Sequence, residues 1–454
     1  MKTISTYTLG CKVNQYDTEA MLESFERAGY VPVRFGEPSD VCLINTCTVT
    51  GTGDQKSLKT IRRVAREQPD CAIVVCGCLA QREAERILAM DGVKLVVGVQ
   101  RRSEVVELLE GALLDGKPVN AVAPLKGAGF EALFVSRHEG KTRATMKIQE
   151  GCDRYCAYCI IPSVRGPVRS MPLKAVRVEA ARLAASGYRE LVLTGIHLAS
   201  YGRGTEDTLI DAIRAVHDTE GVARVRLGSL EPVVVTADFA RQLSELGGIM
   251  RQFHLSLQSG SPTVLKRMRR RYTPDEYRAA AETLRRYMPD CAITTDVIAG
   301  FPGETEAEFQ ETADFIRDIR LARVHVFPYS RRSGTVADAM PGQVPEAVKR
   351  ERARKLIEIG NQLERDFVSS MLNTTQEVLF EQPVGESGSG SEPGSGSGPG
   401  SDSEPGSGLA EGYTGQYIRV RARANPGDIR PVRLIRVEGT LAFGEIVATV
   451  QSPR

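Results

Sequence analysis

The alternation of short apolar runs with amphipathic stretches is the feature that most restricts the fold of this 454-residue chain. Strand-like and helix-like runs alternate over residues 1–115, and the same alternation returns over residues 141–365. Strands separated by helices in this way become parallel neighbours in a sheet that helices cover. We therefore expect an α/β fold with two such regions. Residues 116–140, which are richer in Gly, Pro and charge, are expected to link them.

Three cysteines of the first region stand at equivalent places after its expected strands. These strands are predicted at residues 4–9, 41–45, 72–76 and 94–97, which favours a doubly wound parallel sheet. Cys11, Cys47 and Cys78 come just after the first three. Because ligands bind at the carboxyl edge of such a sheet, the three thiols could converge there. Spacing alone leaves two alternatives open, namely three unconnected cysteines, or Cys76 in place of Cys78.

The second region carries six predicted strand–helix units, which favour a partial (β/α)6 barrel with its chemistry at the carboxyl ends of the strands. The strands are expected at residues 145–149, 190–194, 224–228, 252–256, 292–298 and 323–327. Small or polar residues lie in or just after four of them, namely Gly195, Glu231, Gln258 and Asp296. The turn A-G-F-P-G-E follows the fifth strand. There Gly300 lets the backbone approach a ligand closely, and Pro302 stiffens the turn.

A run of three cysteines occupies the loop after the first strand of this barrel. Residues 149–159 read Q-E-G-C-D-R-Y-C-A-Y-C and place Cys152, Cys156 and Cys159 in a C-x3-C-x2-C pattern. Three thiolates at this spacing can hold three irons of a [4Fe–4S] cube, which leaves the fourth iron open to polarise a substrate. A structural zinc site is the alternative. Zinc normally takes a fourth protein ligand, however, and no Cys or His follows within thirty residues of Cys159.

This C-x3-C-x2-C run resembles the radical S-adenosylmethionine superfamily. The resemblance implies that the open iron chelates the methionine part of the cofactor, and that one electron splits the cofactor into methionine and a 5′-deoxyadenosyl radical. It also implies that the turn at Gly300 and Pro302 corresponds to the family's cofactor-binding G-x-P-G turn. Glu231 and Gln258 are further expected cofactor contacts, together with Gly195 and Asp296.

A second resemblance covers nearly the whole chain. The strings L-G-C-K-V-N-Q-Y-D-T-E, N-T-C-T-V and G-C-L-A-Q, which precede the central cysteine run, are similar to the amino-terminal domain of the methylthiotransferases. That family consists of radical S-adenosylmethionine enzymes with a second [4Fe–4S] cluster held by three cysteines. The resemblance implies that Cys11, Cys47 and Cys78 hold this second cluster.

Residues 369–452 are expected to form a small antiparallel β-barrel, with strands at 376–381, 416–422, 432–437 and 445–450. Glycine and serine fill 17 of the 24 positions of residues 385–408, which cannot offset the entropy of ordering by burial, so we expect a disordered insertion there. Arg419, Arg421 and Arg423 alternate with apolar residues and should share the outer face. The string E-G-Y-T-G-Q-Y-I-R-V resembles the TRAM domain, an OB-like RNA-binding module, which implies that these arginines contact RNA.

A basic run in the central region offers a further contact to nucleic acid. Residues 266–272 read K-R-M-R-R-R-Y, so phosphates could be held by Lys266, Arg267, Arg269, Arg270 and Arg271. A solvated helix end is the alternative. The net charge is only +2, so any surface for nucleic acid must come from local patches of this kind. The five histidines show no ligand spacing and are expected to be structural.

Within the methylthiotransferases, the strings K-I-Q-E-G-C, L-T-G-I-H and H-V-F-P-Y-S-R-R-S-G-T look most like the group that modifies N6-threonylcarbamoyladenosine in tRNA, at position 37 beside the anticodon. The resemblance implies radical removal of hydrogen from C2 of this base and insertion of a methylthio group, with two S-adenosylmethionine molecules used per turnover. Other groups of the family act on isopentenyladenosine in tRNA or on an aspartate of a ribosomal protein. A non-catalytic iron–sulfur protein that binds RNA or carries electrons is a further alternative.

The first residues and the composition bear on compartment and partners. MKTISTYTLG lacks the apolar core of a signal peptide, and no run approaches the length of a membrane span. We therefore expect a cytoplasmic protein without a membrane partner, in which the ten cysteines are thiols or metal ligands. We expect a monomer that binds the anticodon arm of a tRNA. It would also need a sulfur donor and a low-potential electron donor, which the sequence does not identify.

Overall fold

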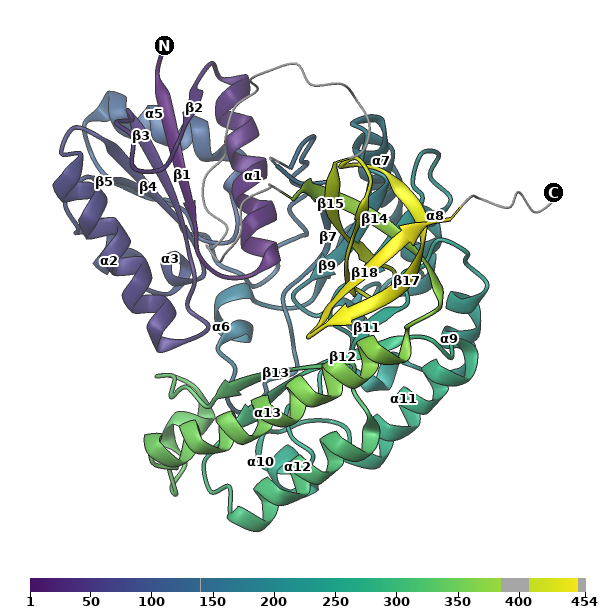
Figure 1. The fold of residues 1–454 in the computed structure, drawn as a ribbon. Helices are drawn as coiled ribbons and strands as arrows, with labels where there is room; N and C mark the ends of the chain where they lie inside the picture. Colours follow the sequence, from purple (N-terminus) through teal and green to yellow (C-terminus); the bar gives the residue numbers. More distant parts are fainter. Residues whose placement is uncertain (139, 385–407, 448–454) are drawn as a thin grey trace.

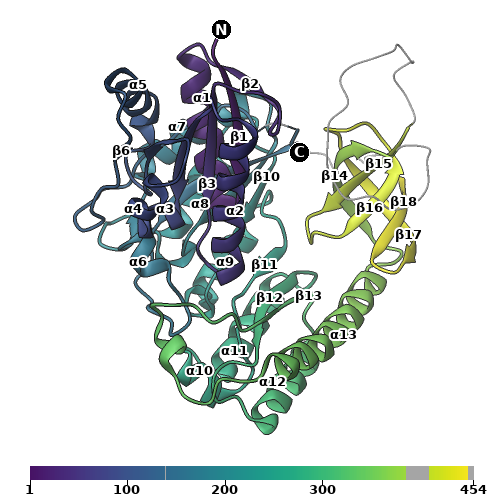
Figure 2. The same ribbon diagram turned by 90° about the vertical axis from the view of Figure 1, so that its left-hand side faces the viewer.

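The computed structural model describes residues 1–138, 140–384 and 408–447. They form three parts in chain order: an amino-terminal α/β sheet, a central strand–helix barrel and a carboxyl-terminal β-barrel (Figure 1). Helix α13 (Glu346–Ser370) packs along the last strand of the central barrel and leads into the terminal one (Figure 2). Within the described ranges, no helix combines the length and the apolarity needed to cross a bilayer.

The amino-terminal part is a parallel sheet of six strands in the order β2-β1-β3-β4-β5-β6. Its strands are β1 (Thr3–Thr8), β2 (Val31–Val33), β3 (Val41–Thr46), β4 (Ala72–Gly77), β5 (Val93–Val96) and β6 (Val119–Asn120). Its helices are α1 (Lys12–Arg27), α2 (Gly51–Glu67), α3 (Cys78–Arg82), α4 (Ala84–Leu88) and α5 (Val105–Asp115). Separate apolar cores lie under α1 and α5 on one face and under α2, α3 and α4 on the other. The predicted doubly wound sheet is therefore confirmed.

The central part contains six parallel strands, each close to its predicted range. They are β7 (Arg143–Glu150), β9 (Glu190–Gly195), β10 (Arg224–Leu227), β11 (Gln252–His254), β12 (Ala292–Ala299) and β13 (Arg323–Pro328). A short strand, β8 (Arg169–Ser170), pairs antiparallel with β7. The strands form two sheets, β10-β9-β7-β8 and β11-β12-β13, which isolated bridges between Val225 and Ile249 and between Leu230 and Leu255 connect. The result is the expected partial barrel.

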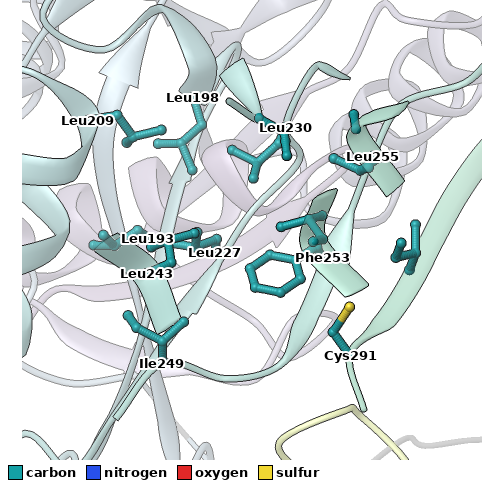
Figure 3. Close-up of a cluster of buried hydrophobic side chains, with 14 of the residues drawn as sticks. Leu193, Leu198, Leu209, Leu227, Leu230, Leu243, Ile249, Phe253, Leu255 and Cys291 are labelled. Carbon is teal, nitrogen blue, oxygen red and sulfur yellow. The ribbon is translucent and has the colours of Figure 1, made fainter. Parts of the chain in front are cut away.

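Helices follow the barrel strands and bury its apolar core. They are α6 (Ile161–Arg165), α7 (Leu173–Ala185), α8 (Leu209–His217), α9 (Ala237–Ser244), α10 (Pro262–Arg267), α11 (Pro274–Tyr287) and α12 (Glu306–Ile319). Three of them, α8, α11 and α12, begin with a threonine capping box, which satisfies the free amides of the first turn. Leucines from several strands and helices meet Phe253 in the core (Figure 3).

The carboxyl-terminal part is a closed barrel in the order β14-β15-β16-β18-β17. Its strands are β14 (Thr375–Pro383), β15 (Leu409–Thr414), β16 (Arg419–Arg423), β17 (Ile429–Glu438) and β18 (Leu441–Ile446). The pairs are antiparallel, as predicted, except that β16 and β18 run parallel. The sequence did not predict β15, and it placed the last strand a few residues too late. Apart from Gly408, the expected insertion at 385–408 lies outside the described residues.

The outer arginines of β16 alternate with its buried residues as the sequence predicts. Val420 and Ala422 are buried in the barrel core, whereas Arg419 and Arg423 are exposed. Arg421 is half-buried, because its guanidinium donates to Glu411 of β15 at 2.9 Å.

A buried ionic cluster fixes the amino-terminal sheet against the central barrel. Asp17 of α1 is paired with Arg102, with Lys147 of β7 and with Arg165 of α6, and Glu150 at the end of β7 shares all three cations. All five side chains are almost fully buried. Each carboxylate is therefore compensated several times, which a buried charge requires. The two parts carrying the cysteine triplets are held in one fixed relation.

Candidate active site

Cys11, Cys47 and Cys78 lie together at the carboxyl edge of the amino-terminal sheet. Cys11 precedes α1, Cys47 follows β3, and Cys78 opens α3 directly after β4. A Cβ built on Gly10, whose φ is +109°, would come within 3.2 Å of the Cys47 sulfur, so the chain before Cys11 packs on that thiol. Burial and the nearby thiols of Cys11 and Cys47 outweigh the opposing effect of Arg165 and raise the pKa of the Cys78 thiol to about 11. The structure thus brings these three predicted residues together.

Spacing left Cys76 and Cys78 as alternative members of the first triplet. In the structure the two side chains lie in different surroundings. Cys76 is fully buried in the apolar core beneath α1 and α5, beside residues such as Leu43 and Leu95. Cys78 packs instead against Ile160 and Val164 of the central part. This placement favours Cys78 as the third member of the first triplet.

Arg165 of α6 connects the first triplet to the central barrel. Its Nε donates to the Cys78 sulfur at 3.2 Å, and its Nη1 donates to Glu150 at 2.9 Å and to Asp17 at 3.2 Å. Its other terminal nitrogen donates to the side-chain carbonyl of Asn14. Burial lowers the pKa of a guanidinium, but the surrounding acidic groups more than reverse this for Arg165. A cation is therefore fixed beside the Cys78 sulfur, where it would stabilise a thiolate.

Cys152, Cys156 and Cys159 occupy the loop between β7 and α6. The Cys152 amide donates to the Gly166 carbonyl at 3.0 Å, and the Cys159 amide to the Cys156 carbonyl at 2.9 Å, which closes the loop into a compact turn. Arg270 donates from Nη1 to the Cys156 sulfur at 3.2 Å. Burial, together with the neighbouring thiols, raises the pKa of Cys152 to about 11 and that of Cys159 to about 12. Binding to a cationic metal centre would offset this penalty on the thiolates.

Neither triplet suits a single zinc ion. Two sulfurs bound to one tetrahedral zinc lie roughly 3.8 Å apart. Among the described residues, only His254, Asp296 and His325 bring three potential ligand atoms within 4.8 Å of one another. In each cysteine triplet the three sulfurs therefore do not all lie within 4.8 Å of one another, which is wider than one zinc ion requires.

Helix α6 brings the two triplets close to each other. Ile160 follows Cys159 directly, and its side chain packs against Cys78 together with Val164. Helix α3, which Cys78 opens, lies against α6 (Figure 1). One short helix thus separates the two groups of thiols.

Glu231, an expected cofactor contact, is the centre of a buried charge cluster. Its carboxylate pairs with Arg154 at 2.8 Å, His197 at 3.0 Å and Arg270 at 3.1 Å. Burial alone would raise the pKa of Glu231, but the His197 hydrogen bond and the two arginines lower it to about 2. Arg270 also contacts Cys156. Glu231 therefore holds the guanidinium of Arg270 beside the second cysteine triplet, which consists of Cys152, Cys156 and Cys159.

Three other expected cofactor contacts face the barrel interior or its edge. Gly195 ends β9, where an added Cβ would meet the Gln149 side chain at 2.7 Å. Gln258 has a φ of +70°, and its backbone amide donates to the backbone carbonyl of Asp296 at 2.9 Å. The Asp296 carboxylate lies 3.4 Å from His254 and 3.2 Å from His325. These two histidines, expected to be structural, therefore form a partly exposed polar group with Asp296 across three neighbouring strands of the barrel.

The turn at Gly300 and Pro302 is shaped by protein contacts on the side from which a Cβ would project. Gly300 has a φ of +74°, and an added Cβ would meet Lys349 of α13 at 2.5 Å. The Gly300 amide donates to Glu304 at 2.8 Å. On the side where a Cβ would project, the neighbour that approaches the Gly300 backbone closely is therefore helix α13. Pro302 is buried beside it.

The predicted basic surface at residues 266–271 needs correction at two positions. Arg270 is buried and turns inward to Cys156 and Glu231, so it cannot reach RNA. Arg267 is held by both oxygens of Glu308, at 2.8 Å each. Lys266, Arg269 and Arg271 remain exposed. Sequence alone could not separate them, because a run of like side chains carries no mark of which one points inward.

A cavity of about 880 Å³ connects the first triplet with the barrel interior and the terminal barrel. Cys11 and Lys12 line it on one side, and Gly195 and Asp296 line it within the central part. The terminal barrel contributes Tyr413, Tyr417 and Arg419. The rings of Tyr413 and Tyr417 stack at 4.8 Å, and the Arg143 guanidinium lies 5.0 Å from the Tyr417 ring. Its size and mixed lining suit a nucleobase with a polar substituent.

Comparisons with known proteins agree with this architecture. Residues 146–316 match the Radical SAM superfamily, and residues 3–98 match the uncharacterized protein family UPF0004. The Threonylcarbamoyladenosine tRNA methylthiotransferase MtaB of Bacillus subtilis (strain 168) is 39% identical over 99% of this chain and 98% of its own. A tRNA-2-methylthio-N(6)-dimethylallyladenosine synthase of Pelotomaculum thermopropionicum is 35% identical over 86% of this chain and 88% of its own.

The fold is also similar to that of TsrM, a radical S-adenosylmethionine methyltransferase from Kitasatospora setae solved with cobalamin and a [4Fe–4S] cluster bound. The two agree with a TM-score of 0.57 over 74% of each chain, at 13% identity, so the likeness concerns the fold alone. The family match over residues 146–316 and the curated relatives define a radical S-adenosylmethionine enzyme. With relatives of 35–39% identity over most of its length, the chain belongs to the tRNA methylthiotransferase family.

Proposed function

We propose that this enzyme adds a methylthio group to C2 of N6-threonylcarbamoyladenosine at position 37 of tRNA. The observation that carries the proposal is the junction at α6, where Ile160 follows one cysteine triplet and packs against Cys78 of the other. A reaction that first activates a carbon and then gives it sulfur needs both centres close to the same atom.

The family's cofactors are a [4Fe–4S] cluster and S-adenosylmethionine. The two groups of three thiols support a proposal of two clusters. We propose that one is held by Cys152, Cys156 and Cys159, and the other by Cys11, Cys47 and Cys78. When bound, these groups supply a 5′-deoxyadenosyl radical to remove the C2 hydrogen and a methylated sulfur to replace it, using two S-adenosylmethionine molecules per turnover. Arg270 and Arg165 would each donate to one thiolate of a triplet and stabilise its negative charge.

The cavity would receive the target base from the anticodon arm. A stacked base reaches such a cavity only after leaving its stack, at a cost of a few kcal/mol. The terminal barrel supports this role, because Tyr413 and Tyr417 present aromatic rings beside Arg419 at the cavity. Arg421 and Arg423, with Lys266, Arg269 and Arg271 on the central part, would hold phosphates further away. The enzyme would act as a cytoplasmic monomer, with separate sulfur and electron donors.

Nucleoside analysis tests the proposal. A host that lacks its own methylthiotransferase for this base would express the chain, and its tRNA would be digested and examined by mass spectrometry. We expect methylthio-threonylcarbamoyladenosine to appear, and methylthio-isopentenyladenosine to stay absent. Sulfur on isopentenyladenosine would favour the second substrate group, to which the 35% identical relative is assigned. Unchanged tRNA with a modified ribosomal protein would reject both.

A non-catalytic iron–sulfur protein is the rival from another class. Reduced, cluster-loaded protein incubated with S-adenosylmethionine should release 5′-deoxyadenosine, and the variant with alanine at Cys152, Cys156 and Cys159 should not. Equal release from both would point to contamination, and release from neither would favour the rival.

A further inference from the structure

Lys12 differs from the other cationic side chains that line the cavity. Four lysine and arginine side chains line it: Lys12, Arg226, Arg323 and Arg419. Arg226 pairs with Glu190 at 2.7 Å, Arg323 with Glu364 at 3.7 Å, and Arg419 with Glu411 at 3.5 Å. Across the described ranges, no carboxylate lies within 4 Å of the Lys12 ammonium.

Lys12 is exposed at the cavity and stands among other cationic side chains. The guanidiniums of Arg143 and Arg226 lie nearby, as does the Tyr417 hydroxyl. Glu190 is the acidic group nearby, but it already compensates Arg224 and Arg226 at 2.8 and 2.7 Å. An unpaired cation placed among other cations is a pre-organised site for an anion.

The position of Lys12 in the chain indicates which anion. It follows Cys11 directly, so it stands beside the first cysteine triplet and opens onto the cavity. In adenine, C2 and the N6 substituent flank N1 on the same edge of the ring. A base whose C2 is directed at the first triplet therefore brings its N6 substituent into the same neighbourhood. The threonylcarbamoyl substituent ends in a carboxylate, whereas an isopentenyl substituent carries no charge.

We propose that Lys12 binds the carboxylate of the threonylcarbamoyl group and thereby selects this base over adenosines with apolar N6 substituents. The inference rests on the proposed function and adds the residue that determines its specificity. The ammonium provides up to three donors to the carboxylate, in a cavity where other charges are already compensated.

Binding measurements with two RNAs and two forms of the protein test this proposal. Two anticodon stem-loops would be prepared, one with threonylcarbamoyladenosine and one with its methyl ester, which removes only the charge. Their affinities would be measured for cluster-loaded wild type and Lys12→Gln. Wild type should bind the carboxylate form roughly ten- to a hundredfold more tightly than the ester, and Lys12→Gln should bind both alike.

Arg419→Gln is the matched control, because Arg419 lines the same cavity but belongs to the proposed RNA surface. It should weaken both stem-loops equally and keep the preference of wild type. If Lys12→Gln weakens both stem-loops equally, Lys12 holds a backbone phosphate and the proposal is overturned. A loss of affinity for S-adenosylmethionine with unchanged stem-loop preference would assign Lys12 to the carboxylate of that cofactor and equally overturn it.

The nucleoside assay separates this inference from the proposed function. If wild type leaves threonylcarbamoyladenosine unmodified in cells, the proposed function fails. If wild type modifies it but Lys12→Gln retains the full preference for the charged stem-loop, only the role of Lys12 fails.

Discussion

Arg165 Nε lies 3.2 Å from the sulfur of Cys78, and this contact joins two parts of the chain that each carry a cysteine triplet. Arg165 ends α6, the helix that begins two residues after Cys159. The same guanidinium donates to Glu150 of β7 and to Asp17 of α1. Arg270 makes the corresponding contact with Cys156 in the second triplet, also at 3.2 Å. Each triplet thus has one buried arginine that donates to one of its sulfurs.

Replacing these two arginines should affect different clusters. Arg165→Gln removes the donor to Cys78, and Arg270→Gln removes the donor to Cys156, so each variant should lose about half of the bound iron. The electron paramagnetic resonance signal of the cluster left in Arg165→Gln should still change when S-adenosylmethionine is added. The cluster left in Arg270→Gln should not respond. Identical responses of the two variants would show that the arginines do not act on separate clusters.

Gly10→Ala should disturb the first triplet through Cys47. The new Cβ would lie 3.0 Å from the Cys47 Cβ and 3.2 Å from its sulfur, and the positive φ adds strain. Gly29→Ala is the matched control, since its φ is +88° but its Cβ meets nothing within 4 Å. Both should lose about 1 kcal/mol of unfolding free energy from strain, but only Gly10→Ala should lose iron. Equal iron contents in the two variants would contradict the placement of Cys47.

Glu231→Gln should remove the ion pair that fixes Arg270 to the central barrel. The change leaves Arg154, His197 and Arg270 without their shared carboxylate, which should lower the unfolding free energy by about 3–5 kcal/mol. Glu308→Gln, which breaks the more exposed pair with Arg267, should cost about 1 kcal/mol or less. Chemical denaturation of both variants measures the difference. Comparable losses would mean that the Glu231 cluster contributes no more than a surface pair.

Stability should fall in acid because of the ionic cluster around Asp17 and Glu150. Burial alone would raise the pKa of Glu150, but Arg165, Lys147 and Arg102 hold it well below its usual range, and the pKa of Asp17 is lowered in the same way. A carboxyl whose folded pKa is lowered stabilises the fold above its unfolded value of about 4 and loses this contribution as pH falls toward the folded value.

Thermal unfolding of cluster-free protein at pH 7, 5 and 3.5 measures this effect. Wild type should lose stability mainly below about pH 5. Glu150→Gln should be less stable than wild type at pH 7, and the difference between them should shrink as pH falls. A difference that stays constant with pH would show that Glu150 does not carry the effect.

The sequence correctly predicted those elements whose residue pattern follows directly from burial. Strands β3 and β4 are buried along their whole length, which explains their continuous apolar runs. Strand β15 was missed because L-A-E-G-Y-T mixes glycine with a charged residue. Glu411 is buried there, where Arg419 and Arg421 of the next strand both pair with it. Such a pair becomes visible only when the two strands lie side by side.

The convergence of Cys11, Cys47 and Cys78 was predictable because strand ends in a parallel sheet meet at one edge. The partners of the thiols were not. Arg270 lies more than a hundred residues from Cys156, within a run of similar basic residues, and only the tertiary fold selects the one that turns inward. The grouping of His254 and His325 around Asp296 also depends on three neighbouring strands of the barrel rather than on spacing in the chain.

The iron and acid-labile sulfide content of anaerobically prepared protein tests most directly whether each triplet holds a cluster. We expect about eight irons and about eight sulfides per chain for wild type. We expect about four of each when alanine replaces either Cys11, Cys47 and Cys78 or Cys152, Cys156 and Cys159. About four irons in wild type, with no further loss when Cys11, Cys47 and Cys78 are replaced, would show that these three cysteines hold no cluster.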